Sequence, residues 1–142
     1  MEASEYPQVT VGEGYAVGDL DALGEGPGFR KVRKGLGVTA FGVNAIVMPA
    51  GYQSGRHYHD TQEELYFVHR GTIEMAFGDG TTHRLDEGSF ARVDAPTIRS
   101  IRNVGDGDAI YLCAGGKDGY VGRDGRAPEG DGRVSGPPGV AH

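Results

Sequence analysis

Two of the five histidines stand two positions apart, in the sequence His57-Tyr58-His59. On a β-strand, side chains at positions i and i+2 point to the same face, so both imidazoles would line one wall. Glu64 follows five residues later, at the start of the apolar run Leu65 to Val68. Two imidazoles and a carboxylate suit a divalent transition metal such as Fe, Mn, Zn or Ni, and leave coordination positions open. His57, His59 and Glu64 are therefore candidate metal ligands, although a His-x-His pair alone is also compatible with an exposed strand.

The residues around these candidates form short apolar runs, separated by turn signals rich in glycine, proline and aspartate. The predicted strands are Leu36 to Met48, Glu64 to His69, Thr72 to Phe77, Thr81 to Leu85, Ser89 to Val93, Ile98 to Asn103 and Ala109 to Ala114. Short strands at regular spacing are typical of an all-β sandwich or barrel. The sequence shows no amphipathic helix longer than about two turns, which argues against an α/β fold.

Composition and the predicted strands divide the chain into three regions. Of 142 residues, 26 are glycine and 7 are proline, and the hydrophobic content of 37% is enough for one modest core. Residues 1–35 are expected to form N-terminal strands or an arm, and residues 36–114 a barrel. Residues 115–142 contain 9 of the glycines and few sizeable apolar groups, so this tail is expected to be flexible.

Charge and cysteine content exclude several classes of partner. A net charge of −6 disfavours nucleic acid and anionic membrane surfaces. The N-terminus has neither a basic start nor an apolar stretch, and no apolar run is long enough to span a membrane, so a soluble cytoplasmic protein is expected. Cys113 is the single cysteine. It can form neither an internal disulfide nor a thiolate cluster, so a metal would have to be held by His, Asp or Glu.

The spacing around the candidate ligands extends to glycines on both sides. Five residues separate Gly51 from His57, and six residues separate Glu64 from Gly71. This arrangement resembles the first motif of the cupin superfamily.

A second stretch resembles the second cupin motif. It begins at Gly88, after 16 intervening residues beyond Gly71, and ends at Asn103. The resemblance covers about half of the chain. It implies a cupin double-stranded β-barrel, related to the jelly roll, which agrees with the all-β pattern of the strands.

One position departs from the pattern. Cupins with four metal ligands usually supply a histidine four residues before the asparagine, where this sequence has Arg99. A guanidinium has no lone pair to donate and cannot be a ligand. Arg99 could bind the carboxylate of an anionic substrate beside the metal, or pair with Glu64 in a site without metal, or point outward. Strand parity gives Arg99 and Ile101 the same face.

The remaining polar and aromatic residues are assigned by strand parity and type. If Glu64 points inward, so do Tyr66 and Val68, and the Tyr66 hydroxyl would either bind a ligand or pack in the core. His69 and His83 are expected to face solvent. Cys113 is expected to be a small buried apolar residue.

Two classes of function remain open. One is a metal-dependent enzyme of the dioxygenase, isomerase or decarboxylase type acting on a small anionic molecule. The other is a metal-free binding, sensor or storage module in which Arg99 pairs with Glu64. The fold alone does not choose between them. A transcription regulator would need a DNA-binding domain for which the chain has neither length nor charge. The family resemblance also implies a homodimer.

Overall fold

The computed structural model describes residues 5–131. Its elements, in chain order, are β1 (Thr10–Gly12), β2 (Tyr15–Val17), the 3-10 turn η1 (Asp21–Leu23), β3 (Gly28–Arg30), α1 (Val32–Leu36), β4 (Gly42–Met48), β5 (Tyr58–His59), β6 (Glu63–Arg70), β7 (Ile73–Phe77), β8 (Thr82–Leu85), β9 (Phe90–Val93), β10 (Arg99–Asn103), β11 (Ala109–Gly116) and β12 (Gly125–Arg126). Within these residues, no helix is long and apolar enough to cross a membrane.

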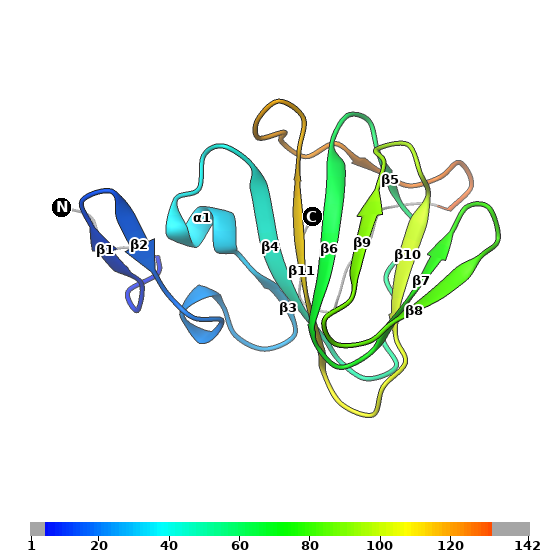
Figure 1. Ribbon diagram of the computed structural model, residues 1–142, viewed down its shortest axis with the longest axis horizontal. Helices are drawn as coiled ribbons and strands as arrows, with labels where there is room; N and C mark the ends of the chain where they lie inside the picture. Colours follow the sequence, from blue (N-terminus) through cyan, green and yellow to red (C-terminus); the bar gives the residue numbers. More distant parts are fainter. Residues whose placement is uncertain (1–4, 132–142) are drawn as a thin grey trace.

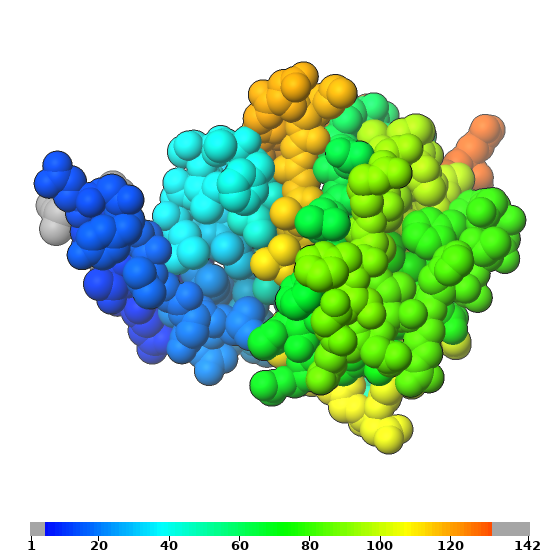
Figure 2. Space-filling view, in the orientation of Figure 1, coloured from blue at the N-terminus to red at the C-terminus, as the bar shows by residue number. Residues whose placement is uncertain are grey.

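Two antiparallel sheets form the body of the molecule (Figure 1). The larger has the strand order β3-β4-β11-β6-β9 and the smaller the order β10-β7-β8. A bridge between His57 and Arg99 places the β5 region beside β10, and β12 pairs with β5. The crossover connections and all-antiparallel pairing give a jelly-roll-like sandwich, as predicted for a cupin barrel. The β1–β2 hairpin lies at one end, beyond α1 (Figures 1 and 2).

The core lies between the two sheets. Along β6, Glu64, Tyr66 and Val68 are buried whereas Leu65 is exposed, which confirms the predicted period of two. The buried cluster consists of Ile46, Met48, Tyr66, Val68, Ile73, Met75, Leu85, Val93, Ile101, Ala109 and Tyr111. Burial of each large apolar side chain contributes roughly 1.5–3 kcal/mol. This cluster therefore fixes the strands on which the polar site residues are carried.

A glycine of the first motif shapes the turn after β6. Gly71 has a φ of 78°, a left-handed conformation in which other residues are strained. A Cβ at this position would also lie 3.0 Å from Cα of Ala109. The turn therefore requires glycine both for its backbone conformation and for its close approach to β11.

The first predicted strand is wrong at its N-terminal end. The sequence predicts a strand from Leu36 to Met48, but Val32–Leu36 is a short helix and β4 begins only at Gly42. The helix ends because Gly37 adopts a left-handed conformation, with a φ of 77°, and its N–H bonds to the carbonyl of Arg33. Residue type alone gave this apolar stretch a β preference, whereas its glycine positions determine where the strand starts.

Part of the predicted tail takes part in strand pairing and polar contacts. β11 continues through Gly115 and Gly116, and β12 pairs with β5 beside His59. The polar contacts include an ion pair between Arg126 and Asp60 with an N–O distance of 2.8 Å. The flexibility expected from composition stays a prediction, and residues 132–142 lie outside the described residues.

Candidate metal centre

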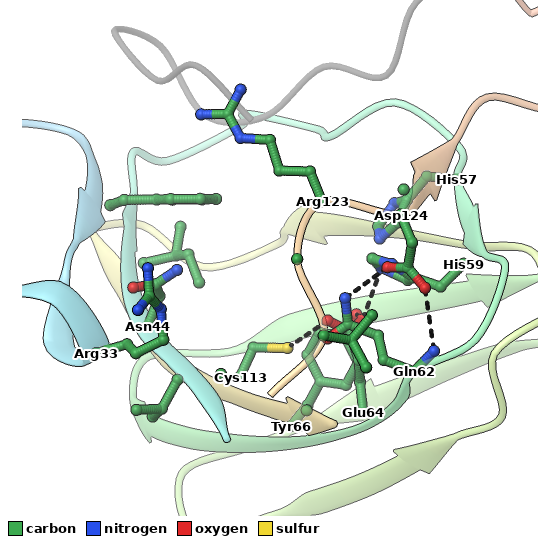
Figure 3. A pocket seen from close by; sticks show the side chains of 18 of the residues that line it. Arg33, Asn44, His57, His59, Gln62, Glu64, Tyr66, Cys113, Arg123 and Asp124 are labelled. Carbon is green, nitrogen blue, oxygen red and sulfur yellow. Dashed lines mark hydrogen bonds and ion pairs between the residues drawn. The ribbon is translucent and has the colours of Figure 1, made fainter. Parts of the chain in front are cut away.

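The three predicted ligands come together at one end of the sandwich. His57 and His59 lie at β5, and Glu64 lies at the start of β6. One potential ligand atom from each residue lies within 4.8 Å of the others. The two imidazole rings meet edge to face, with centroids 5.3 Å apart. The sequence separation of two thus places both histidines at the same site, as expected, and the β6 parity turns Glu64 toward them (Figure 3).

The Glu64 carboxylate is the centre of a buried hydrogen-bond network. Its Oε1 accepts from Nη2 of Arg99 at 2.8 Å and from the hydroxyl of Tyr66 at 2.6 Å, and lies 3.2 Å from Nε2 of His59. Its Oε2 accepts from the thiol of Cys113 at 3.2 Å. Burial would raise the pKa of Glu64, but the hydrogen bond and charge of His59, with Tyr66 and Arg99, hold it well below its usual range.

Arg99 is completely buried and its donors are used inside the protein. Its exposed fraction is 0%. Nη2 donates to Glu64, and Nη1 points to the backbone carbonyls of Thr97 at 2.6 Å, Ala95 at 3.2 Å and Asp94 at 3.3 Å. The expectation that Arg99 points outward is therefore wrong. Glu64, Tyr66 and the turn after β9 contact the guanidinium, and its contact with a substrate carboxylate stays a prediction.

The Tyr66 hydroxyl also belongs to this hydrogen-bond network. Tyr66 is 2% exposed, donates to Glu64, and lies 3.4 Å from Nε of Arg99. Burial raises its pKa well above the usual value, so it stays a donor. The hydroxyl thus orients the carboxylate of Glu64, and because Tyr66 also lines the adjoining cavity, its contact with a substrate stays a prediction.

His59 is oriented by a residue far away in the sequence. Its Nδ1 lies 2.7 Å from Oδ1 of Asp124 (Figure 3). The pKa of Asp124 is lowered to about 2, because hydrogen bonds from Gln62 and His59 outweigh its burial. An ionised carboxylate only accepts, so Nδ1 carries the proton and Nε2 faces Glu64. Although burial lowers the pKa of His59, its contacts with Glu64 and Asp124 raise it overall.

His57 has the opposite electrostatic environment. Its burial and the nearby charge of Arg99 lower its pKa to about 4, so the ring is neutral at pH 7. Nδ1 lies 3.5 Å from the carbonyl oxygen of Gly55. A proton on Nδ1 would leave the lone pair of Nε2 for a metal.

A divalent metal fits this donor set. A metal-binding histidine characteristically donates its second N–H to a carboxylate or a carbonyl group, and His59 does so to Asp124. Neutral His57 and ionised Glu64 supply the other donors. The positive charge of Arg99 opposes cation binding, but its pairing with Glu64 partly offsets this repulsion. His57, His59 and Glu64 can therefore hold a metal with open positions.

The site opens into a cavity of about 430 Å³. Its volume is in the range of small-molecule sites. Four cationic side chains, Lys31, Arg33, Lys34 and Arg123, line it together with two acidic ones, Glu64 and Asp124. The chain as a whole has more acidic than basic residues. The cavity lining therefore has more basic than acidic side chains, whereas the whole chain has more acidic ones.

The sequence profile of the cupin domain matches residues 44–115. This region contains the predicted ligands and most of both sheets, with β3 outside it. The chain belongs to the cupin family.

Solved structures agree with this cupin assignment. A cupin protein from Bacteroides fragilis is 24% identical, with a TM-score of 0.60, and the match covers 79% of this chain and 92% of that one. A sugar phosphate isomerase of the cupin superfamily from Silicibacter pomeroyi is 28% identical, with a TM-score of 0.58, over 63% of this chain and 58% of that one. The DMSP lyase DddQ from Ruegeria pomeroyi is 21% identical, with a TM-score of 0.57.

The two named enzymes match this chain over only part of their own length. The DMSP lyase match covers 66% of this chain and 46% of that enzyme. This cupin thus aligns with less than two thirds of both named enzymes. Among curated proteins, no sequence matches this chain.

Sequence reasoning missed two groups of residues in this cupin site. Asp124 lies in the glycine-rich segment and belongs to neither motif, so no sequence signal marked it. The cations of α1 were placed in an N-terminal arm, without a role. Strand parity could have predicted that Cys113 faces Glu64, because Cys113 and Tyr111 share a face of β11. Cys113 was expected to be a buried apolar residue, but it is partly exposed and its thiol contacts Glu64.

The two remaining predicted histidines have the expected positions. His69 at the end of β6 and His83 on β8 are exposed, and neither belongs to the cluster of possible ligands. The prediction that they face solvent is confirmed.

Proposed function

We propose that this cupin binds a divalent transition metal through His57, His59 and Glu64, and a small anionic molecule in the adjoining cavity. When bound, the metal would supply a Lewis-acid or redox centre with open positions. The protein residues would position it: Asp124 holds the proton on Nδ1 of His59, while Arg99 and Tyr66 fix the carboxylate of Glu64. Iron, manganese, zinc and nickel all suit this donor set.

The contact between His59 and Asp124 carries the proposal. A neutral His59 with its proton on Nδ1 presents a lone pair toward Glu64, and the two atoms are 3.2 Å apart. Two lone pairs at this distance repel unless a proton or a cation lies between them. A metal would satisfy both groups at once, and the hydrogen bond to Asp124 would make the imidazole a better donor.

The charge of the cavity supports an anionic ligand. The basic residues of α1 and Arg123 line it, whereas Glu64 and Asp124 are engaged by hydrogen bonds within the site. The sugar phosphate isomerase, at 28% identity, is named for an anionic substrate class.

A specific contact favours one alternative. Nη2 of Arg99 lies 2.8 Å from Oε1 of Glu64, so a fixed cation already neutralises the carboxylate. In a metal-free binding or sensor module, Arg99 would take the electrostatic place of a metal, and a protonated His59 would donate to Glu64. This second function shares the cavity and the anionic ligand.

Elemental analysis of the purified protein distinguishes the two functions. We expect close to one metal ion per chain, and we expect His59→Ala to lower the content by at least about tenfold, because it removes one of three ligands. His83→Ala, an exposed histidine outside the site, is the matched control and should keep the metal. Protein that remains metal-free after incubation with Fe²⁺, Mn²⁺, Zn²⁺ and Ni²⁺ would establish the alternative.

The homodimer stays a proposal based on the family. Val43, Ala45 and Ile46 on β4 are buried within this chain, whereas Phe41 before β4 and Leu65 and Phe90 on the outer face of the larger sheet are exposed. Exposed apolar groups of this size are typical of an interface. Sedimentation analysis measures the association, and Leu65→Lys should weaken it.

A further inference from the structure

The cavity has a cationic end that the proposed metal site does not use. Lys31 and Arg33 come from the start of α1, and Arg123 comes from the segment before β12. Among residues 5–131, these three side chains have no ion-pair partner, whereas Lys34 lies 3.3 Å from Glu5. These three cationic side chains line one cavity without an ion-pair partner in the described residues, so they would attract an anion.

We propose that this cationic end binds the phosphate group of a small phosphate monoester, whose other end reaches the metal site. This inference rests on the proposed function for the placement of the rest of the ligand. A phosphate monoester carries a charge of about −1.5 to −2 at pH 7 and has three acceptor oxygens. Such a group matches several cations better than a single carboxylate does.

The guanidinium of Arg33 is oriented for this role. Its Cζ lies 4.2 Å from the centroid of the Tyr120 ring. Stacking on an aromatic face holds the guanidinium while leaving its N–H groups in the plane for hydrogen bonds. Planar paired donors suit phosphate oxygens. Tyr120 itself lines the cavity, so α1 and the segment that carries Arg123 meet at this end.

Residues of the larger sheet connect the cationic end of the cavity with the candidate metal ligands. Asn44 on β4 faces the cavity and is paired in register with Cys113 on β11, whose thiol contacts Glu64. Figure 3 shows Arg33 and Asn44 on one side of the cavity and His57, His59 and Asp124 on the other. The Asn44 amide would contact the uncharged middle of the ligand. A phosphate on the α1 side and a metal-binding oxygen on the β5 side therefore define a ligand with two polar ends.

Inorganic phosphate is the probe for this subsite, because the proposal concerns the phosphate group itself. In amide NMR spectra of the full chain, we expect saturable shifts at residues 31–37 and 119–125 as phosphate is added at constant ionic strength. Acetate, a monoanion, should bind at least about tenfold more weakly, because it has one charge and two acceptor oxygens. Equal affinity for acetate and phosphate would overturn the proposal.

Matched variants test the residues. Arg33→Gln and Arg123→Gln should each raise the phosphate Kd by about tenfold, since each removes a charged donor. Lys117→Gln removes one positive charge from the exposed start of the same segment, outside the cavity lining, and should leave the Kd unchanged. An equal effect of all three variants would show general charge attraction and overturn the subsite.

The His59→Ala variant separates this proposal from the metal site. Phosphate binding at α1 should survive in that variant, with the same shifted amides, even though the metal is lost. If phosphate binding disappears together with the metal, phosphate binds the metal, and the cationic subsite is wrong while the proposed metal function stands. If phosphate binds normally to a protein that takes up no metal, the proposed metal function fails and the subsite stands.

Discussion

The barrel, residues 44–115, and the following segment, residues 117–131, contribute to the site in different ways. The barrel carries His57, His59 and Glu64 in a region fixed by strand pairing and a buried core. The segment contributes Asp124, which accepts from the backbone N–H groups of Thr61 and Gln62 at 2.8 and 3.1 Å and from His59. Strand register thus sets where the ligands lie, whereas a polar contact from outside the barrel sets how one ligand is protonated.

The two regions also differ in what holds them in place. Large apolar side chains such as Met48, Val68 and Ile73 are fully buried in the barrel. The segment relies on hydrogen bonds and on ion pairs at the surface, including Arg56 with Asp131. Surface ion pairs contribute little to stability because water and salt screen them. Changes in the barrel are therefore expected to affect folding, and changes in the segment to affect the site.

The largest effect is expected for Arg99→Met. This change leaves the buried carboxylate of Glu64 without its ion-pair partner, which typically costs about 3–5 kcal/mol. Chemical denaturation should show a loss of this size in the free energy of unfolding. Arg102→Met, three residues along β10 and exposed to solvent, should change stability little. Equal stability of the two variants would contradict a structural role for the buried pair.

A smaller effect, confined to metal binding, is expected for Asp124→Asn. The change removes the charge that holds the proton on Nδ1 of His59, and loss of such a contact typically weakens metal binding by about 10- to 100-fold. Competition with a chelator measures the affinity. Asp131→Asn removes a carboxylate from the same segment that pairs with Arg56 rather than with His59, and should leave the affinity unchanged. A similar loss in both variants would exclude a specific role for Asp124.

The smallest effect on stability is expected for truncation after Gly116. The segment buries little apolar surface, so the Tm should fall by only a few degrees. Metal affinity should fall as far as in Asp124→Asn, because both changes remove the same carboxylate. A fall in Tm as large as that of Arg99→Met would show that the segment stabilises the barrel, and would remove the distinction between the two regions.

The sequence predicted the part of the site that depends on strand geometry. The alternation Glu64, Tyr66, Val68 and the pair His57 and His59 needed only the period of two, and these residues lie where expected. Arg99 and Ile101 are both buried, but Ser100 between them is buried too, so burial along β10 does not display the period of two. Strand parity does not show which polar side chains on one face will contact each other. The contact between Arg99 and Glu64 belonged to only one of three alternatives, the one without metal, and the structure shows the contact itself.

The sequence could not predict contacts made by irregular segments. Asp124 is brought to His59 by a backbone that follows neither strand nor helix periodicity before β12. Its neighbours are glycine, arginine and other polar residues, a composition typical of disordered chain. The cations of α1 were missed for a related reason. A helix of five residues has too few turns to produce a recognisable amphipathic pattern.

The carbonyl oxygen of Ala95 connects position 99 to the metal site. It lies 3.2 Å from Nη1 of Arg99 and accepts from the backbone N–H of His59 at 2.7 Å. Exchanging Arg99 for a histidine would add a third imidazole, and thus a fourth donor, to the cluster, but would also remove the group that anchors the turn on which His59 rests. A four-ligand form of this site would therefore need a second change that holds the Ala95 turn in place of the guanidinium.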